Sequence, residues 1–125
     1  MSRIKQQIKN NEQKRERIIK KLLDLWPIIP GAYKEVYRKC GKVNCQCVHA
    51  KGHPLKRITW TEKGLSRSKA ISSEDVQWIL KATANYKEFR KLEKKLIDIE
   101  KVIHEILASY KQQKINTCRK QKKLI

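Results

Sequence analysis

The sequence has few acidic residues, few glycines and no long apolar run. Residues 26–71 contain only two carboxylates, Glu35 and Glu62, which argues against the clustered carboxylates that hold Mg²⁺ in a metal-dependent nuclease or transposase. The four glycines form no phosphate-cradling loop, and the three histidines give no Ser-His-Asp arrangement. No apolar run reaches the roughly 18 residues of a membrane-spanning helix, and the first residues lack the apolar stretch of a secretory signal. We therefore expect a cytoplasmic protein, with the nucleoid as one location, that has no membrane partner, no small-molecule substrate and no enzymatic activity.

Positive charge dominates the composition. The chain has 31 Lys and Arg residues against 12 Asp and Glu residues, a formal net charge of +19. Residues 1–25, 26–71 and 111–125 carry eight, ten and six of these cations against three, two and no acids, whereas residues 72–110 carry seven of each. A charge this far from zero opposes compaction unless phosphates or other anions neutralise it. The basic segments therefore predict a polyanionic partner, and the neutral segment predicts a separate structural role.

The neutral segment predicts a long coiled-coil helix over residues 72–114, followed by a basic tail over residues 115–125. Ser72 is a suitable helix N-cap, with Glu74 and Asp75 in the first turn. Apolar residues then recur at alternating steps of three and four, the spacing of a coiled-coil seam. These residues are Phe89, Leu92, Leu96, Ile99, Ile103, Ile106 and Tyr110. A helix of this length needs a partner helix to cover its seam.

Residues 1–26 predict an N-terminal helix that can supply this partner. Ile4, Ile8, Ile18 and Leu22 fit the same pattern, and Pro27 ends the helix because proline lacks a backbone N–H and clashes with the preceding turn. Two arrangements are open: an antiparallel hairpin within one chain, or a homodimer through residues 76–110. Because the N-terminal helix is much the shorter, part of the seam stays uncovered, so we expect a homodimer or another helix-pairing partner as well.

Residues 31–71 predict a different kind of module. β-forming residues cluster at 33–38, 55–61 and 65–71, and Glu62-Lys63-Gly64 is a turn sequence between the last two clusters. This pattern predicts a small three-stranded β-meander. The predicted fold class is therefore mainly α, with an N-terminal helix and a long C-terminal helix flanking a small β module. This module is too small to be stable without a staple, that is, a bound metal ion or a covalent cross-link.

Cysteine and histidine in this module predict that the staple is zinc. Cys40, Cys45 and Cys47 lie in one turn segment, and His49 and His53 follow shortly after. Zn²⁺ prefers thiolate and imidazole ligands in tetrahedral sets of four, and a chain without an export signal favours a metal site over disulfides. We expect a structural Zn²⁺ site made by the three cysteines and one histidine. His49 is only two residues after Cys47, a short spacing for a ligand that must close the site, and this favours His53. The alternative is that the three cysteines are reduced thiols without a metal.

The same segment resembles a family of small prokaryotic proteins of uncharacterised function. The residues that carry the resemblance are Pro30-Gly31, Tyr37-Arg38-Lys39-Cys40-Gly41-Lys42, Asn44-Cys45, Cys47, Gly52-His53 and the helix start at Ser72-Ser73-Glu74. The family shares an Arg-x-Cys-Gly-Lys-x-x-Cys-x-Cys core followed by Gly-His and a long helix, and some members are found with mobile-element genes or labelled as transposase-related. The resemblance implies His53 as the fourth zinc ligand and implies no established activity. One departure is that Pro54-Leu55-Lys56-Arg57 stands where family members often have a Gly-Pro-aromatic run.

The basic residues of the module predict a nucleic-acid interface. Cations neutralise phosphates, and aromatic residues such as Tyr33, Tyr37 and Trp60 can stack on bases, although a core role is the more ordinary one for Trp60. The predicted contact residues are Arg38, Lys39, Lys42, Lys51, Lys56, Arg57, Arg67 and Lys69. We therefore expect a non-enzymatic, zinc-stapled protein that binds DNA or RNA and serves as an accessory or regulatory protein of a mobile element. The alternatives are a coiled-coil protein-assembly module with no direct nucleic-acid role and, more remotely, DNA strand transfer by a Tyr37 nucleophile surrounded by Arg38, Arg57, Arg67 and His53.

Overall fold

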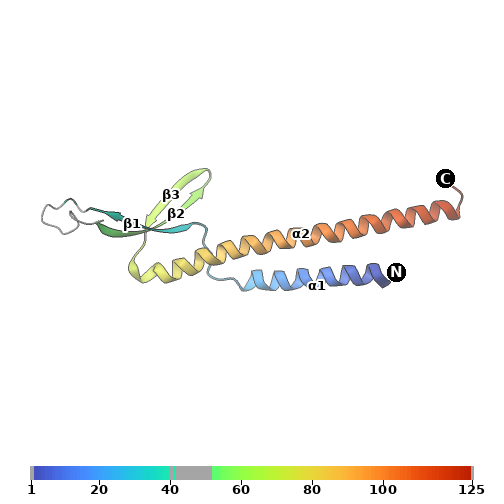
Figure 1. Ribbon diagram of the computed structural model, residues 1–125, viewed down its shortest axis with the longest axis horizontal. Coiled ribbons are helices and arrows are strands. Elements are labelled where there is room, and N and C mark those ends of the chain that lie inside the picture. The colour runs from blue at the N-terminus through green and yellow to red at the C-terminus, as the bar shows by residue number, and fades with distance from the viewer. Residues whose placement is uncertain (1, 40, 42–51, 125) are drawn as a thin grey trace. The chain divides into compact units, whose positions relative to one another are not determined.

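The computed structural model describes residues 2–39, 41 and 52–124. In chain order, its elements are helix α1 (Ser2–Asp24), strands β1 (Ala32–Arg38), β2 (His53–Glu62) and β3 (Leu65–Ala70), the short 3₁₀ helix η2 (Ser73–Asp75) and helix α2 (Val76–Gln121) (Figure 1). An N-terminal helix, a long C-terminal helix and a small three-stranded antiparallel sheet confirm the predicted fold class at this level. Within the described residues, neither helix has a stretch long and apolar enough to cross a membrane.

The chain divides into two compact units, and the division falls inside α2. The helical unit contains Met1–Asp24 and Phe89–Ile125, and the sheet unit contains Leu25–Glu88. The first turns of α2 therefore belong with the sheet, while the rest of the helix belongs with α1.

In the helical unit, α1 and α2 run antiparallel. Arg3, Ile4 and Gln7 line one groove together with residues 105–113, and residues 14–21 line another together with residues 92–99. Early residues of α1 thus lie beside late residues of α2, as the two helices in Figure 1 also show. Of the two arrangements that the sequence left open, the structure has the hairpin within one chain; the additional homodimer stays a prediction.

Burial along both helices follows the predicted seam. Leu92 is buried, with 4% of its surface exposed, and the other six predicted seam positions between Phe89 and Tyr110 are partly buried. On α1, the seam residues from Ile4 to Leu22 are partly buried in the same way. Burial of these apolar side chains is the main stabilising contribution to the hairpin, because the hydrophobic effect scales with the apolar area removed from water.

The sheet unit is held together by a small core and by the linker that follows α1. The strand order is β1-β2-β3, and both pairings are antiparallel. Ile58 of β2 and Ala82 of α2 are buried, with 6% and 0% exposed. The backbone N–H of Ile29 donates to the Ala82 carbonyl oxygen at 3.1 Å, and the side-chain amide of Asn85 donates to the Pro27 carbonyl oxygen at 2.9 Å. These bonds tie the linker to the first turns of α2.

Positive φ angles shape the sheet in the connection between β2 and β3 and before β1. Lys63 and Gly64 have φ values of 50° and 79° in the two-residue connection between β2 and β3. Positive φ at both central residues is the pattern of a type I′ turn, whose twist matches that of the flanking strands. Gly31, before β1, has φ of 130°, and a Cβ atom there would lie 2.6 Å from the Thr59 carbonyl oxygen. Only glycine fits at that point.

Candidate nucleic-acid interface

The strand register sorts the side chains of the sheet onto two faces. Directly paired residues in antiparallel strands project to the same side, and successive residues alternate. Tyr33 pairs with Ile58, and Ile58 pairs with Lys69, so these residues share one side, which we call the Ile58 face. Lys34 pairs with Arg57, and Arg57 pairs with Ala70; we call this opposite side the Arg57 face.

The Ile58 face lies against the start of α2. A groove of about 630 Å³ is lined by Ile58 and Lys69 from the sheet and by Trp78 and Ile79 from α2. Glu74 and Asp75, which precede α2, line the same groove. This face therefore carries the core of the sheet unit and has carboxylates at its border.

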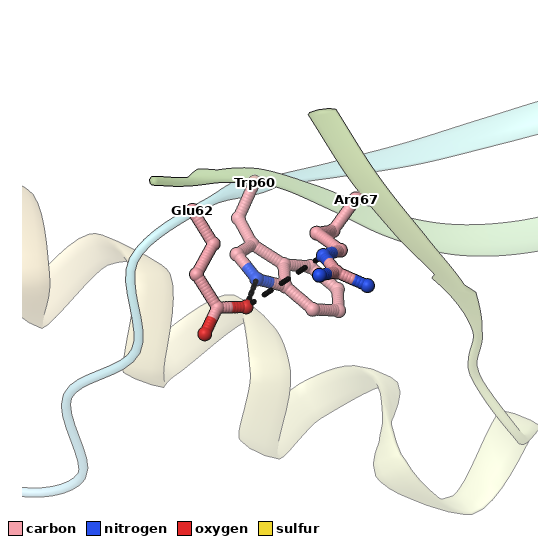
Figure 2. Close-up of polar contacts among 3 residues, drawn as sticks. All are labelled: Trp60, Glu62 and Arg67. Carbon is pink, nitrogen blue, oxygen red and sulfur yellow. Dashed lines mark hydrogen bonds and ion pairs between the residues drawn. The ribbon is translucent and has the colours of Figure 1, made fainter. Parts of the chain in front are cut away.

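Two cations of the Ile58 face, Lys56 and Arg67, have partners within the protein. Lys56 lies opposite Glu35 in the register, and its ammonium group donates to the Ser73 hydroxyl at 3.2 Å. One carboxylate oxygen of Glu62 makes both contacts drawn in Figure 2: it accepts from the Trp60 indole N–H at 3.5 Å and lies 3.8 Å from the Arg67 Nε. About half of the surface of both the Arg67 and the Glu62 side chains is exposed, so this ion pair contributes little stability. It does reduce the net charge that this face presents.

Tyr33 also lies on the Ile58 face, and its surroundings shift the pKa of its hydroxyl group. Partial burial raises the pKa of its hydroxyl above the ordinary value, and the nearby carboxylate of Glu35 and phenol of Tyr37 add to the rise. All three residues are odd-numbered positions of β1 and lie on the Ile58 face. The neutral phenol is thus the form that this setting favours.

The Arg57 face has a different charge pattern. Lys34 lies directly opposite Arg57, and Arg38 lies directly opposite His53. In the three described strands, no Asp or Glu falls on this face. A like-charged pair directly opposite in a sheet is destabilising, by roughly 0.2–1 kcal/mol. A bound anion between Lys34 and Arg57 would remove this cost.

Hydroxyl groups accompany the cations of the Arg57 face. The Nε–H of Arg57 donates to the Ser68 hydroxyl of β3 at 2.8 Å, a bond that does not involve the terminal N–H groups of the guanidinium. The register adds Thr59, Thr61 and Ser66 to the same side. Serine and threonine hydroxyls donate to phosphate oxygens and fix the register of a bound backbone. The face therefore combines positive charge with neutral donors.

The predicted contact residues do not form one surface. Arg38 and Arg57 lie on the Arg57 face, whereas Lys56, Arg67 and Lys69 lie on the Ile58 face. Lys39 follows the end of β1, and Lys42 and Lys51 lie outside the described residues. Sequence reasoning missed Lys34. The available signal was the alternation of Lys34, Val36 and Arg38 in β1, which places both cations on one side of a strand.

The predicted zinc ligands are only partly described. Cys40, Cys45 and Cys47, as well as His49, lie outside the described residues, and His53 is the first residue of β2. Among the residues that are described, no group of three or more His, Cys, Asp or Glu side chains is arranged to hold a metal ion. Gly52 has φ of 102°, and a Cβ atom there would lie 2.6 Å from the Arg38 carbonyl carbon. Glycine at 52 therefore lets the chain pass close to the end of β1, directly before His53.

The groups required for tyrosine-mediated strand transfer are divided between the two faces. Tyr37 lies on the Ile58 face, because it pairs with Pro54. Arg38, His53 and Arg57 lie on the Arg57 face. Arg67 shares the face of Tyr37 and is paired with Glu62. The described strands thus keep Tyr37 away from three of the four groups that would activate a phosphate for it.

Comparison with known proteins places this architecture in a family. The family model described as Domain of unknown function (DUF6788) matches residues 3–81. The match covers α1, all three strands and the first turn of α2. The chain therefore belongs to the DUF6788 family. No curated protein and no solved structure matches it.

Proposed function

We propose that the protein is a non-enzymatic nucleic-acid-binding protein whose β module holds a structural zinc ion and contacts the phosphate backbone through the Arg57 face. The observation that carries the proposal is the like-charged pair of Lys34 and Arg57 on a face without carboxylates in the described strands. The net charge of +19 supplies the long-range attraction that such contacts need. An accessory or regulatory role in a mobile element is part of the proposal and rests on the sequence resemblance.

The zinc site is proposed on sequence chemistry and on the position of one ligand. Cys40, Cys45, Cys47 and His53 are the expected ligands, and the resemblance favours His53 over His49. What supports this choice is the register: His53 pairs with Arg38, and Cys40 follows two residues later in the sequence. A bound Zn²⁺ would close the end of the sheet and supply folding free energy, since such sites do not exist in the unfolded chain.

Salt dependence of binding tests the nucleic-acid proposal. With six to ten phosphate contacts, the slope of log K against log salt concentration is expected to be about −5 to −9. The measurement is a titration of labelled DNA and RNA oligonucleotides with the full chain at several salt concentrations, accompanied by metal analysis of the purified protein. A slope near zero would contradict the proposal. If the purified protein binds nucleic acid but contains no zinc, only the proposed zinc site is wrong.

A coiled-coil assembly module is the second candidate. Several apolar side chains of the helical unit stay exposed outside the seam, with Leu23 at 80%, Ile97 at 55% and Leu107 at 44%. Such residues favour a further helix partner, including a homodimer through residues 76–110. Analytical ultracentrifugation after nuclease treatment and at high salt tests this candidate. A stable dimer or a captured protein partner under those conditions, together with no nucleic-acid binding, would favour assembly as the function.

A further inference from the structure

We infer that the helical unit carries a second phosphate-backbone site, in the groove between α1 and α2. This inference rests on the proposed function and extends it to a part of the chain that the β module does not include. The groove has a volume of about 390 Å³ and is lined by Lys14, Arg17 and Lys21 from α1 and by Lys95 from α2. The lining contains a single carboxylate, that of Asp98.

The floor of the groove is apolar and firmly packed. Ile18 of α1 and Leu92 and Ile99 of α2 form it, and Leu92 is 4% exposed. These are seam residues, so the packing of the hairpin fixes the distance between the two helices that line the groove. The cations themselves are exposed. Long Lys and Arg side chains lie along apolar surface and keep their charged ends in water, where a phosphate can reach them.

Most cations of α1 lie on one of two flanks of the helix. Lys14, Arg17 and Lys21 follow one another at steps of three and four and line the groove, and no acid of α1 lines it with them. The other flank is formed by residues 5, 9, 12, 16 and 20, where the cations Lys5, Lys9 and Lys20 stand together with the acids Glu12 and Glu16. Lys20 lies 3.6 Å from Glu16.

The spacing favours an extended polyanion over a small anion. Residues three or four apart on a helix are about one turn, or about 5 Å, apart along the axis. Lys14, Arg17 and Lys21 thus offer three cations in a row, with Lys95 on the facing wall. A single phosphate would use one or two of them, whereas a nucleic-acid backbone presents phosphates in series.

A pair of matched triple variants tests the inference in the full chain. K14Q/R17Q/K21Q removes the groove cations, and K5Q/K9Q/K20Q removes the same number of charges from the other flank of the same helix. Glutamine has a helix propensity close to that of lysine and arginine, so both variants retain α1, which circular dichroism checks. We expect the groove variant to weaken oligonucleotide binding at least tenfold and to reduce the salt slope by about 2–3. The control should change log K by less than a third as much as the groove variant does.

The outcomes separate this inference from the proposed function. If the wild-type chain binds no nucleic acid, both fail. If the wild type binds and the two triple variants lose affinity equally, only the groove is refuted, because net charge then explains the loss. If the groove variant keeps its oligonucleotide affinity and loses binding to phosphatidylserine vesicles, the groove binds a lipid surface and the inference is wrong.

Discussion

At the scale of single residues, Lys34 and Arg57 distinguish the two faces of the sheet. On the Ile58 face, the charged pair directly opposite in the register is Lys56 with Glu35, which is favourable. On the Arg57 face, Lys34 lies directly opposite Arg57 in the register, and a pairing of like charges is unfavourable in a sheet. Stability alone would not select such a pair. The proposed binding of a phosphate backbone would account for it.

Lys34→Glu should therefore separate stability from binding. The substitution replaces the repulsion with an ion pair between the introduced carboxylate and Arg57, and it should raise the free energy of unfolding by about 0.5–1 kcal/mol. Oligonucleotide affinity should fall at least tenfold, because the variant loses a phosphate contact and gains a repulsive charge. Urea denaturation measures the first effect and an oligonucleotide titration the second.

Lys56→Glu provides the opposite-sign control for stability. It places a second carboxylate opposite Glu35 and removes the bond to Ser73, so the free energy of unfolding should fall. If Lys34→Glu also lowered stability, the charge pattern assigned to the Arg57 face would be wrong.

At the scale of elements, the connection between β2 and β3 is built with one unfavourable residue. Gly64 adopts positive φ without cost, whereas Lys63 does so with a Cβ atom. Lys63→Asn should raise the free energy of unfolding by about 0.5–1 kcal/mol, because asparagine is preferred at this position of a type I′ turn. Thermal or urea unfolding measures the change. Lys63→Gln removes the same charge without the turn preference and should have almost no effect; an equal gain in both variants would attribute the change to charge.

The helices could be predicted from sequence in more detail than the sheet surface. The seam positions from Phe89 to Tyr110 followed from spacing alone, since a period near 3.5 residues defines one side of a helix without knowledge of any partner. The faces of the sheet depend on strand register, which could not be read from the sequence. The predicted set of contact residues therefore combined cations from opposite faces and left out Lys34. The predicted seam begins at Phe89, which is also where the helical unit begins. The hydrogen bonds at Ala82 and Asn85, which tie the first turns of α2 to the linker of the sheet unit, had no signal in the sequence.

At the scale of the whole molecule, each of the two units carries its own cationic surface. The sheet unit has the Arg57 face, and the helical unit has the groove at Lys14, Arg17 and Lys21. Two sites on one chain raise the effective concentration of each for a long polyanion, so loss of one should weaken binding without abolishing it. Residues 72–110, neutral in total, contribute one cation, Lys95, and one carboxylate, Asp98, to the groove.

The most direct test of the central claim compares two double variants of the sheet. K34Q/R57Q removes two cations from the Arg57 face, and K56Q/R67Q removes two from the Ile58 face, so both chains have the same net charge. The salt dependence of oligonucleotide binding is measured for both. The Arg57-face variant should reduce the slope of log K against log salt concentration by about 2, while the Ile58-face variant should change it by less than about 1. Equal reductions, or a larger reduction from the Ile58 face, would contradict the assignment of the phosphate-binding surface.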